Sequence, residues 1–119
     1  NHIDYCGGIE KAIEKAWQYV QLHKPGLKIE VETRSLEDVR KVMATGKGKV
    51  FRIMLDNFKP ALVKEAVALI GEDFETEASG GINLENITDY AKAGVDFVSV
   101  GALIHQARSL DLSLKAVKD

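Results

Sequence analysis

Four short strand-like runs recur along this chain at nearly equal spacing, and a helix-like segment follows each of the first three. Equivalent points in these runs, Val31, Met54, Ala78 and Ser99, are 23, 24 and 21 residues apart. A strand, a helix and the next strand at this spacing predict parallel strands joined by right-handed crossovers. The predicted fold class is therefore α/β with a parallel sheet. No linker or low-complexity segment marks an internal domain boundary.

Hydrophobic periodicity gives the expected bounds of the elements. Apolar residues return every three or four positions in segments that predict helices, at 9–22, 36–45, 61–70 and 84–93. Alternating or continuous apolar runs predict strands at 27–33, 50–55, 74–78 and 97–100. In the tail we expect a short helix and a last short strand at 110–114. Ser35 and Asn83 stand where helix N-caps belong, and Pro60 suits a first helical turn.

Two of the strand-like runs end abruptly in small residues. The first ends at Ser79, Gly80 and Gly81, and the second ends at Gly101 and Ala102. Glycine lets a backbone approach a ligand closely, and the N–H groups at a helix N-terminus attract anions. In barrel enzymes the loops after the last strands often bind phosphate. Both segments are therefore candidate phosphate-binding loops. His105, just beyond the second, is a further candidate, with a packing or surface role as the alternative.

Acidic residues also occur at the expected strand ends. Glu30 and Glu32 belong to the first run, and Asp56 follows the second. Carboxylates at such positions can hold Mg²⁺ together with a phosphorylated substrate, or stabilise positive charge in a transition state. A helix cap or a solvated position is the alternative for each. Glu75 and Glu77 share one face of their strand, and they would require partners if that face is a barrel interior.

Composition excludes several classes of function. The net charge is −2 and the basic residues are scattered, so the sequence shows no basic cluster of the kind that binds nucleic acids. No apolar run approaches the length of about 20 residues that spans a bilayer. The single cysteine, Cys6, cannot form an internal disulfide, which favours a reducing compartment. No cluster of cysteine and histidine suggests zinc.

The chain length limits how much of a barrel these residues can form. A complete (β/α)₈ barrel takes about 250 residues, whereas this chain has 119. We therefore expect roughly half of a barrel, either a piece of a longer protein or a unit completed by another copy. The first is favoured because residue 1 begins inside a strand–helix unit. Open strand edges predict self-association in the second case.

The ordered motifs resemble a known family over essentially the whole chain. They are Asn1-His2-Ile3, Ile29-Glu30-Val31-Glu32, Ile53-Met54-Leu55-Asp56-Asn57, Glu77-Ala78-Ser79-Gly80-Gly81-Ile82, Gly94-Val95-Asp96, Ser99-Val100-Gly101-Ala102-Leu103 and Leu110-Asp111-Leu112-Ser113-Leu114-Lys115. In this order they resemble the C-terminal portion of the quinolinate phosphoribosyltransferases, the carboxylating nicotinate-nucleotide pyrophosphorylases. Each motif alone is weak, but the set is specific.

The resemblance implies a fold, a reaction and an assembly. Members of the family transfer phosphoribose from phosphoribosyl pyrophosphate to quinolinate and release CO₂ and pyrophosphate, which gives nicotinate mononucleotide for NAD synthesis. They use Mg²⁺, and they form dimers or larger homo-oligomers in which a neighbouring subunit contributes to each site. Their open seven-stranded α/β barrel follows an N-terminal domain, so residues 1–119 would be the C-terminal part of the barrel, without that domain and the first barrel strands. A cytoplasmic location is expected.

The resemblance also assigns roles to residues of this chain. Glu30 and Asp56 match the acidic residues that hold the Mg²⁺-bound phosphoribosyl pyrophosphate and stabilise the oxocarbenium-like ribose. The matching phosphate-binding positions are Ser79, Gly80, Gly81, Gly101, Ala102 and His105. Many members have Thr-His-Ser where this chain has Ile104-His105-Gln106, so polar contacts beside His105 are not carried over.

The family's lysine and aspartate directly before Asn-His, and the basic residues that bind the two quinolinate carboxylates, are not among these 119 residues. The isolated chain is thus expected to carry the phosphoribosyl half of the site and to be inactive. Two alternatives stay open at this point: another phosphate-binding βα-barrel enzyme, and an inactive half-barrel that serves as a folding or assembly unit.

Overall fold

A computed structural model of the chain describes residues 2–3, 8–101 and 103–108. The strands of its sheet are β1 (His2–Ile3), β2 (Glu30–Thr33), β3 (Arg52–Asp56), β4 (Glu75–Ser79), β5 (Phe97–Val100) and β6 (Leu103–Gln106). The helices are α1 (Ile9–His23), α2 (Leu36–Gly46), α3 (Pro60–Ile70) and α4 (Ile87–Lys92).

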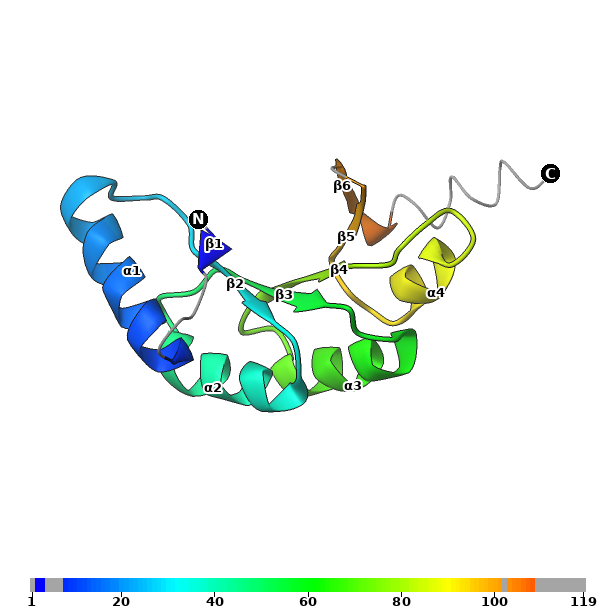
Figure 1. Cartoon of the computed structure of the whole chain (residues 1–119), viewed down its shortest axis with the longest axis horizontal. Coiled ribbons are helices and arrows are strands. Elements are labelled where there is room, and N and C mark those ends of the chain that lie inside the picture. Colours follow the sequence, from blue (N-terminus) through cyan, green and yellow to red (C-terminus); the bar gives the residue numbers. More distant parts are fainter. Residues whose placement is uncertain (1, 4–7, 102, 109–119) are drawn as a thin grey trace.

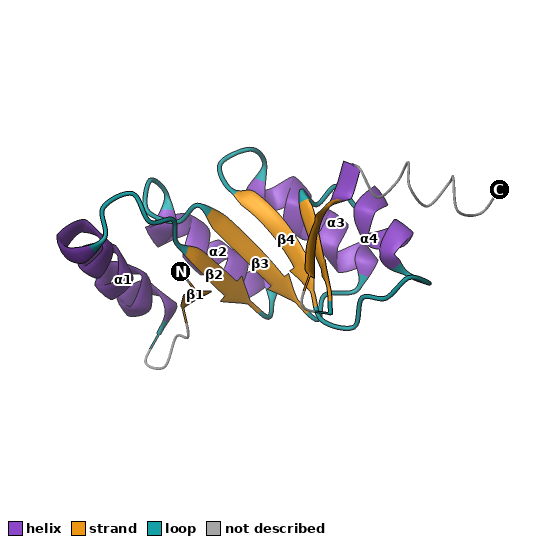
Figure 2. Ribbon diagram, turned by 90° about the horizontal axis from the view of Figure 1, so that it is seen from above, coloured by secondary structure: helices purple, strands orange, loops and turns teal. Residues whose placement is uncertain are grey.

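The strands form one curved sheet in the order of the sequence. β1 to β5 are parallel, and β6 turns back to pair antiparallel with β5. The helices line the convex side of the sheet, and its concave side is not covered by any helix that the structure describes (Figure 1). Seen from above, the strands lie side by side with the helices behind them (Figure 2). This is the arrangement of part of an α/β barrel, whose interior corresponds to the concave face.

Period-two alternation decides which side chains face the helices. On β2 and β3, intermediate and buried residues alternate, and the buried members Val31, Ile53 and Leu55 pack toward the helices. Ala78 and Val98 continue this layer on β4 and β5 and are in register with each other. The opposite residues of each strand, many of them charged, line the concave face. The concave face is therefore the place to look for chemistry.

The expected parallel α/β architecture is confirmed, and the bounds of α1, α2, α3 and β5 agree with the sequence predictions within two residues. Two expectations about the strands were wrong. The first strand begins at Glu30 rather than at residue 27, because the ladder to β1 and β3 starts there. Residues 103–106 form a strand, whereas the sequence predicted none there. The expected strand 110–114 lies outside the described residues.

The last helix also differs from the prediction. α4 begins at Ile87, not at residue 84, because the side chain of Asn83 closes a turn before the helix starts. Asn83 Oδ1 accepts hydrogen bonds from the N–H groups of Glu85 and Asn86, at 2.9 and 3.1 Å. The side chain of Asn86 in turn accepts from the Asn83 N–H and donates to the Gly81 carbonyl. These turn N–H groups therefore have partners within the loop.

Candidate active site

The carboxyl ends of β3 and β4 bring together two of the predicted site residues. Asp56 and Ser79 are the last residues of these strands and are directly paired in the ladder. Both side chains lie on the concave face, where the Ser79 hydroxyl donates a 3.3 Å hydrogen bond to Asp56 Oδ1. The Asp56 side chain keeps a quarter of its surface exposed. This pair offers an accessible carboxylate and a hydroxyl at the edge where parallel α/β folds bind ligands.

The glycine loop after β4 is pressed against the end of β3. Gly80 and Gly81 both have positive φ, +84° and +70°. The Asn57 N–H donates a 2.8 Å hydrogen bond to the Ser79 carbonyl. A Cβ atom on Gly80 would lie 2.5 Å from Asn57 Oδ1, whereas one on Gly81 would meet no atom within 4 Å. Gly80 is therefore required by packing and conformation, and Gly81 leaves open space at the candidate phosphate loop.

A third strand contributes charge to the same edge. Glu32, near the end of β2, forms a 2.9 Å ion pair through Oε2 with Arg34 Nη2. Arg34 Nε also lies 3.9 Å from Asp56 Oδ2. The guanidinium thus lies between two carboxylates from neighbouring strands. Glu32 and Asp56 are therefore brought to the same rim of the sheet.

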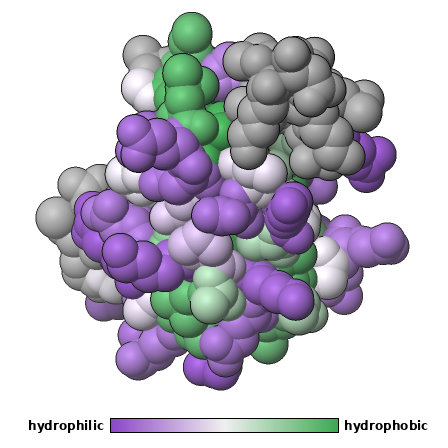
Figure 3. Space-filling model, turned by 90° about the vertical axis from the view of Figure 1, so that its right-hand side faces the viewer, coloured by the Kyte–Doolittle hydropathy of each residue, from purple (hydrophilic) through white to green (hydrophobic). Residues whose placement is uncertain are grey.

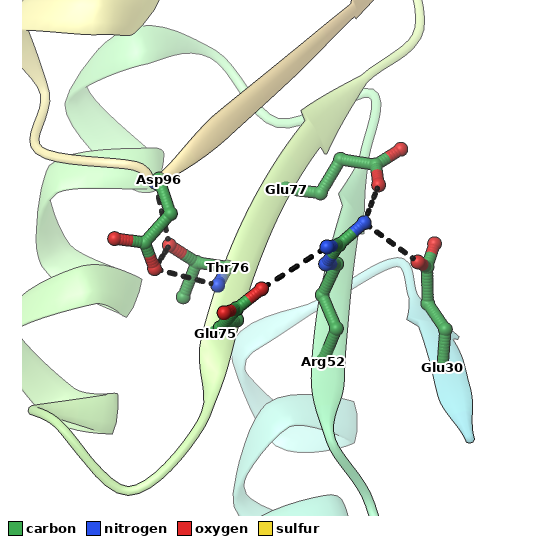
Figure 4. Close-up of polar contacts among 6 residues, drawn as sticks. All are labelled: Glu30, Arg52, Glu75, Thr76, Glu77 and Asp96. Carbon is green, nitrogen blue, oxygen red and sulfur yellow. Dashed lines mark hydrogen bonds and ion pairs between the residues drawn. The ribbon is translucent and has the colours of Figure 1, made fainter. Parts of the chain in front are cut away.

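A second charged cluster occupies the amino ends of the same strands. Arg52 is surrounded by Glu30, Glu75 and Glu77, with nitrogen–oxygen distances of 3.4, 3.0 and 3.2 Å (Figure 4). Its guanidinium also lies 4.2 Å from the ring centroid of Phe97. The partners that Glu75 and Glu77 would need on an interior face are thus supplied by one arginine. This cluster connects four neighbouring strands.

Burial perturbs the ionisation of this cluster. The Glu77 side chain is 1% exposed. Burial raises its pKa, and the nearby Glu30 carboxylate raises it further against the opposing effect of Arg52. Burial also acts to lower the pKa of Arg52, but the surrounding glutamates outweigh it and raise that pKa overall. Ionisation of Glu77 is therefore less favourable than ionisation of an exposed glutamate, although Arg52 offsets part of this effect.

The predicted position of Glu30 is wrong. The sequence placed it at the carboxyl end of its strand, but it is the first residue of β2 and pairs in register with Arg52. Asp56 lies four residues further along β3, which is about 13 Å at the rise of a strand. Glu30 and Asp56 therefore do not share a site on these strands. The misplacement arose because the sequence predicted a strand that starts three residues too early.

The second predicted phosphate segment lies on a β-hairpin. Gly101, with φ +62°, follows β5 and leads toward β6, while Ala102 lies outside the described residues. His105 is in register with Val98, whose side chain packs toward the helices. His105 thus belongs to the face opposite Asp56 and Ser79, and the described structure does not bring it to them.

Among the described residues, no group of three or more histidine, cysteine, aspartate or glutamate side chains could hold a metal ion. The carboxylates that form ion pairs with the Arg34 side chain at the rim are Glu32 and Asp56. Within the same residues, no helix has the length and apolar character needed to cross a membrane.

The comparisons with known proteins agree with this architecture. The sequence profile described as quinolinate phosphoribosyl transferase, C-terminal domain, matches residues 1–115. The chain belongs to the quinolinate phosphoribosyltransferase family. It is 41% identical over 127 aligned positions to the Nicotiana tabacum protein named quinolinate phosphoribosyltransferase (decarboxylating) 2b, mitochondrial, with 97% of this chain and 36% of that protein covered.

An archaeal relative and two solved structures extend the match. The Methanocaldococcus jannaschii protein, named probable nicotinate-nucleotide pyrophosphorylase (carboxylating), is 41% identical, with 99% of this chain and 42% of that protein covered. The nicotinate-nucleotide pyrophosphorylase structure from Francisella tularensis gives a TM-score of 0.68 at 34% identity, covering 83% of this chain and 34% of that one. The structure of NadC from Streptococcus pyogenes gives a TM-score of 0.70 at 32% identity, covering 81% of this chain and 32% of that one. The chain thus spans about a third of the length of several matched relatives, which confirms the prediction of a partial barrel.

Two residues of these charged clusters were not singled out from the sequence. Arg34 and Arg52 were overlooked because their partners depend on which residues of neighbouring strands lie opposite each other. The signal for Arg52 was its position as the one charge inside the apolar run 50–55. Asn57 was noted beside Asp56, but its contact with Gly80 is visible only in three dimensions.

Proposed function

We propose that this chain is the part of a quinolinate phosphoribosyltransferase that binds the phosphoribosyl group. The whole reaction would transfer phosphoribose from phosphoribosyl pyrophosphate to quinolinate and release CO₂ and pyrophosphate, giving nicotinate mononucleotide. Family membership supports the reaction. The observation that carries the site is the meeting of Asp56, Ser79 and the Gly80–Gly81 loop at one strand edge.

The proposal assigns the acidic pair to Glu32 and Asp56. Both are near the carboxyl ends of their strands, and one arginine contacts both. Glu30, which the resemblance suggested, is two register positions away from Glu32 on the same strand and contacts Arg52. Carboxylates at the rim would face a ribose held by the glycine loop and would stabilise the positive charge that develops on it.

Mg²⁺ fits this donor set only together with its substrate. The ion prefers hard oxygen ligands and usually takes one or two carboxylates, the remaining positions being filled by phosphate oxygens and water. Glu32 and Asp56 supply those carboxylates, and Ser79 supplies a hydroxyl at 3.3 Å from Asp56. When bound, the ion would neutralise the pyrophosphate leaving group. The protein's own contribution is to orient the ribose phosphate at Gly80 and Gly81.

The other residue roles that the family resemblance implies, and the expected assembly and location, are also proposals. Gly101, Ala102 and His105 are assigned to the substrate on resemblance alone, and the hairpin geometry gives His105 no contact with Asp56. Assembly into a homo-oligomer and a cytoplasmic location also stay predictions.

The test measures binding of phosphoribosyl pyrophosphate with Mg²⁺ to the chain by calorimetry. Asp56→Asn should weaken binding about tenfold to a hundredfold, because a charge-assisted contact contributes about 1.5–3 kcal/mol. The matched control is Asp73→Asn, which makes the same chemical change at an exposed aspartate before the amino end of β4 and should bind like the unaltered chain. Equal binding by the Asp56 variant, or none by the unaltered chain, would contradict the proposal.

A further inference from the structure

Asn57 stands out at the end of β3 because its backbone is left-handed. Among residues 2–3, 8–101 and 103–108, it is the only residue other than glycine with a positive φ, which is +61°. Asparagine adopts this region more readily than most residues, whereas alanine adopts it at a cost in free energy. The shape of the chain at this point therefore depends on the type of residue at position 57.

The residues on both sides of Asn57 fix this turn. Asp56, before it, is in register with Ser79 in the ladder between β3 and β4. Phe58, after it, is 1% exposed and packs in the hydrophobic core. The chain thus passes from a paired strand residue to a buried aromatic side chain within one residue. A sparsely populated backbone conformation persists where the surrounding structure determines it, and here it lies beside the candidate phosphate loop.

The turn brings two parts of Asn57 against the glycine loop. The Asn57 N–H donates its hydrogen bond to the Ser79 carbonyl, and the side-chain amide lies close enough to Gly80 to exclude a Cβ atom there. The N–H groups of Gly80 and Gly81 donate no hydrogen bond to any residue that the structure describes. The loop is thus held from the β3 side, while its two glycine N–H groups stay available to a ligand.

We propose that Asn57 is a positioning residue for the phosphate-binding loop. Its left-handed turn places its N–H on the Ser79 carbonyl and its side chain against Gly80, which holds the glycine N–H groups at the rim beside Asp56. Asn57 acts through the loop rather than by contact with the phosphate. The inference rests on the proposed function and extends it, because it names the residue that fixes the loop relative to the carboxylate.

Two substitutions separate the turn from the side chain. Asn57→Gly removes the side chain but keeps the left-handed conformation accessible, whereas Asn57→Ala removes the amide and also disfavours that conformation. Binding of phosphoribosyl pyrophosphate with Mg²⁺ to the full chain is measured by calorimetry, well below the unfolding temperature of each variant. Asn57→Ala should bind about threefold to tenfold more weakly than the unaltered chain, because a smaller fraction of it holds the loop in the binding conformation. Asn57→Gly should bind within about twofold of the unaltered chain, because its loop keeps that conformation.

The matched control makes the same two changes at Gln18, an exposed residue in the middle of α1. In a helix interior glycine is less stable than alanine, so the order of stability is the reverse of that at position 57. Both Gln18 variants should bind like the unaltered chain, although Gln18→Gly unfolds at a lower temperature. Far-ultraviolet circular dichroism verifies that each variant is folded. If Asn57→Ala does not fold, Asn57→Gln replaces it, because it keeps an amide but lacks the tolerance of asparagine for positive φ.

The outcomes distinguish this inference from the proposed function. Weaker binding in Asn57→Ala that Asn57→Gly restores, with no change in the Gln18 pair, supports the inference. Unchanged binding in Asn57→Ala, an equal loss in Asn57→Gly, or an equal loss in Gln18→Gly overturns the role of the turn. The proposed function then still stands if Asp56→Asn weakens binding. Absence of binding to the unaltered chain, or unchanged binding in Asp56→Asn, overturns the proposed function and this inference with it.

Discussion

At the scale of single residues, Glu77 is the most constrained ionisable group that the structure describes. It lies in the middle of the concave face, 1% exposed, with Arg52 as its ion-pair partner. Glu30 and Glu75 contact the same guanidinium from the neighbouring strands. Because burial raises the pKa of Glu77, the folded protein holds this proton at pH values where the unfolded chain has lost it.

The sign of the resulting pH dependence follows from this proton. Glu77 contributes most to stability below the ordinary pKa of a glutamate, and its contribution is lost as pH rises through the raised pKa of the folded state. Glu77→Gln removes that ionisation. Its free energy of unfolding should therefore fall less steeply with rising pH than that of the unaltered chain, as measured by urea denaturation at several pH values.

A control isolates the cluster from the other ionisable groups. Lys49 lowers the pKa of Glu14, so the contribution of Glu14 to stability is lost as pH falls. This contribution is the same in the unaltered chain and in Glu77→Gln, and it therefore cancels when their slopes are compared. Glu65→Gln makes the same substitution on the exposed face of α3 and should leave the slope unchanged. A slope for Glu77→Gln equal to that of the unaltered chain would show that folding does not raise the pKa of Glu77.

At the scale of elements, the junction between β4 and its glycine loop is fixed by contact with the end of β3. Gly80→Ala should destabilise the protein by about 3 kcal/mol, since it adds the cost of positive φ to overpacking against Asn57. Gly81→Ala, with positive φ but open space around its Cβ, should cost only about 1–2 kcal/mol. Thermal unfolding of the two variants measures the difference. Equal losses would show that the loop moves away from Asn57 without cost.

The elements also show which features a sequence can predict. Periodicity and glycine positions predicted the strand–helix order, the loop at Ser79–Gly81 and the nearness of Asp56, because these depend on local pattern and on parallel topology. Glu30 was misplaced because the start of a strand depends on where its neighbours begin. α4 was predicted three residues too long at its start because Asn83 forms a turn, and Arg52 was missed because its partners come from three other strands.

At the scale of the whole molecule, the curved sheet has an exposed apolar edge. β6 is an edge strand of the described sheet, and Leu103 and Ile104 are 65% and 53% exposed. Figure 3 shows apolar surface at the top of this end of the molecule, at the height of β6 in Figure 1. Edge strands with apolar side chains promote pairing with another chain, and lysine at such positions opposes it. This edge is therefore the expected place of self-association.

Sedimentation velocity over a range of concentrations tests that expectation. The unaltered chain should associate. The double variant Leu103→Lys with Ile104→Lys should favour the monomer and raise the dissociation constant of self-association at least tenfold. Leu84→Lys is the matched control, because Leu84 is 77% exposed but lies in the turn before α4, away from any strand edge. If the control shifts the equilibrium equally, general surface charge would explain the effect. If the unaltered chain is monomeric at every concentration, the concave face and its edges are stable in water without a partner, because the charged residues that line the face keep it solvated.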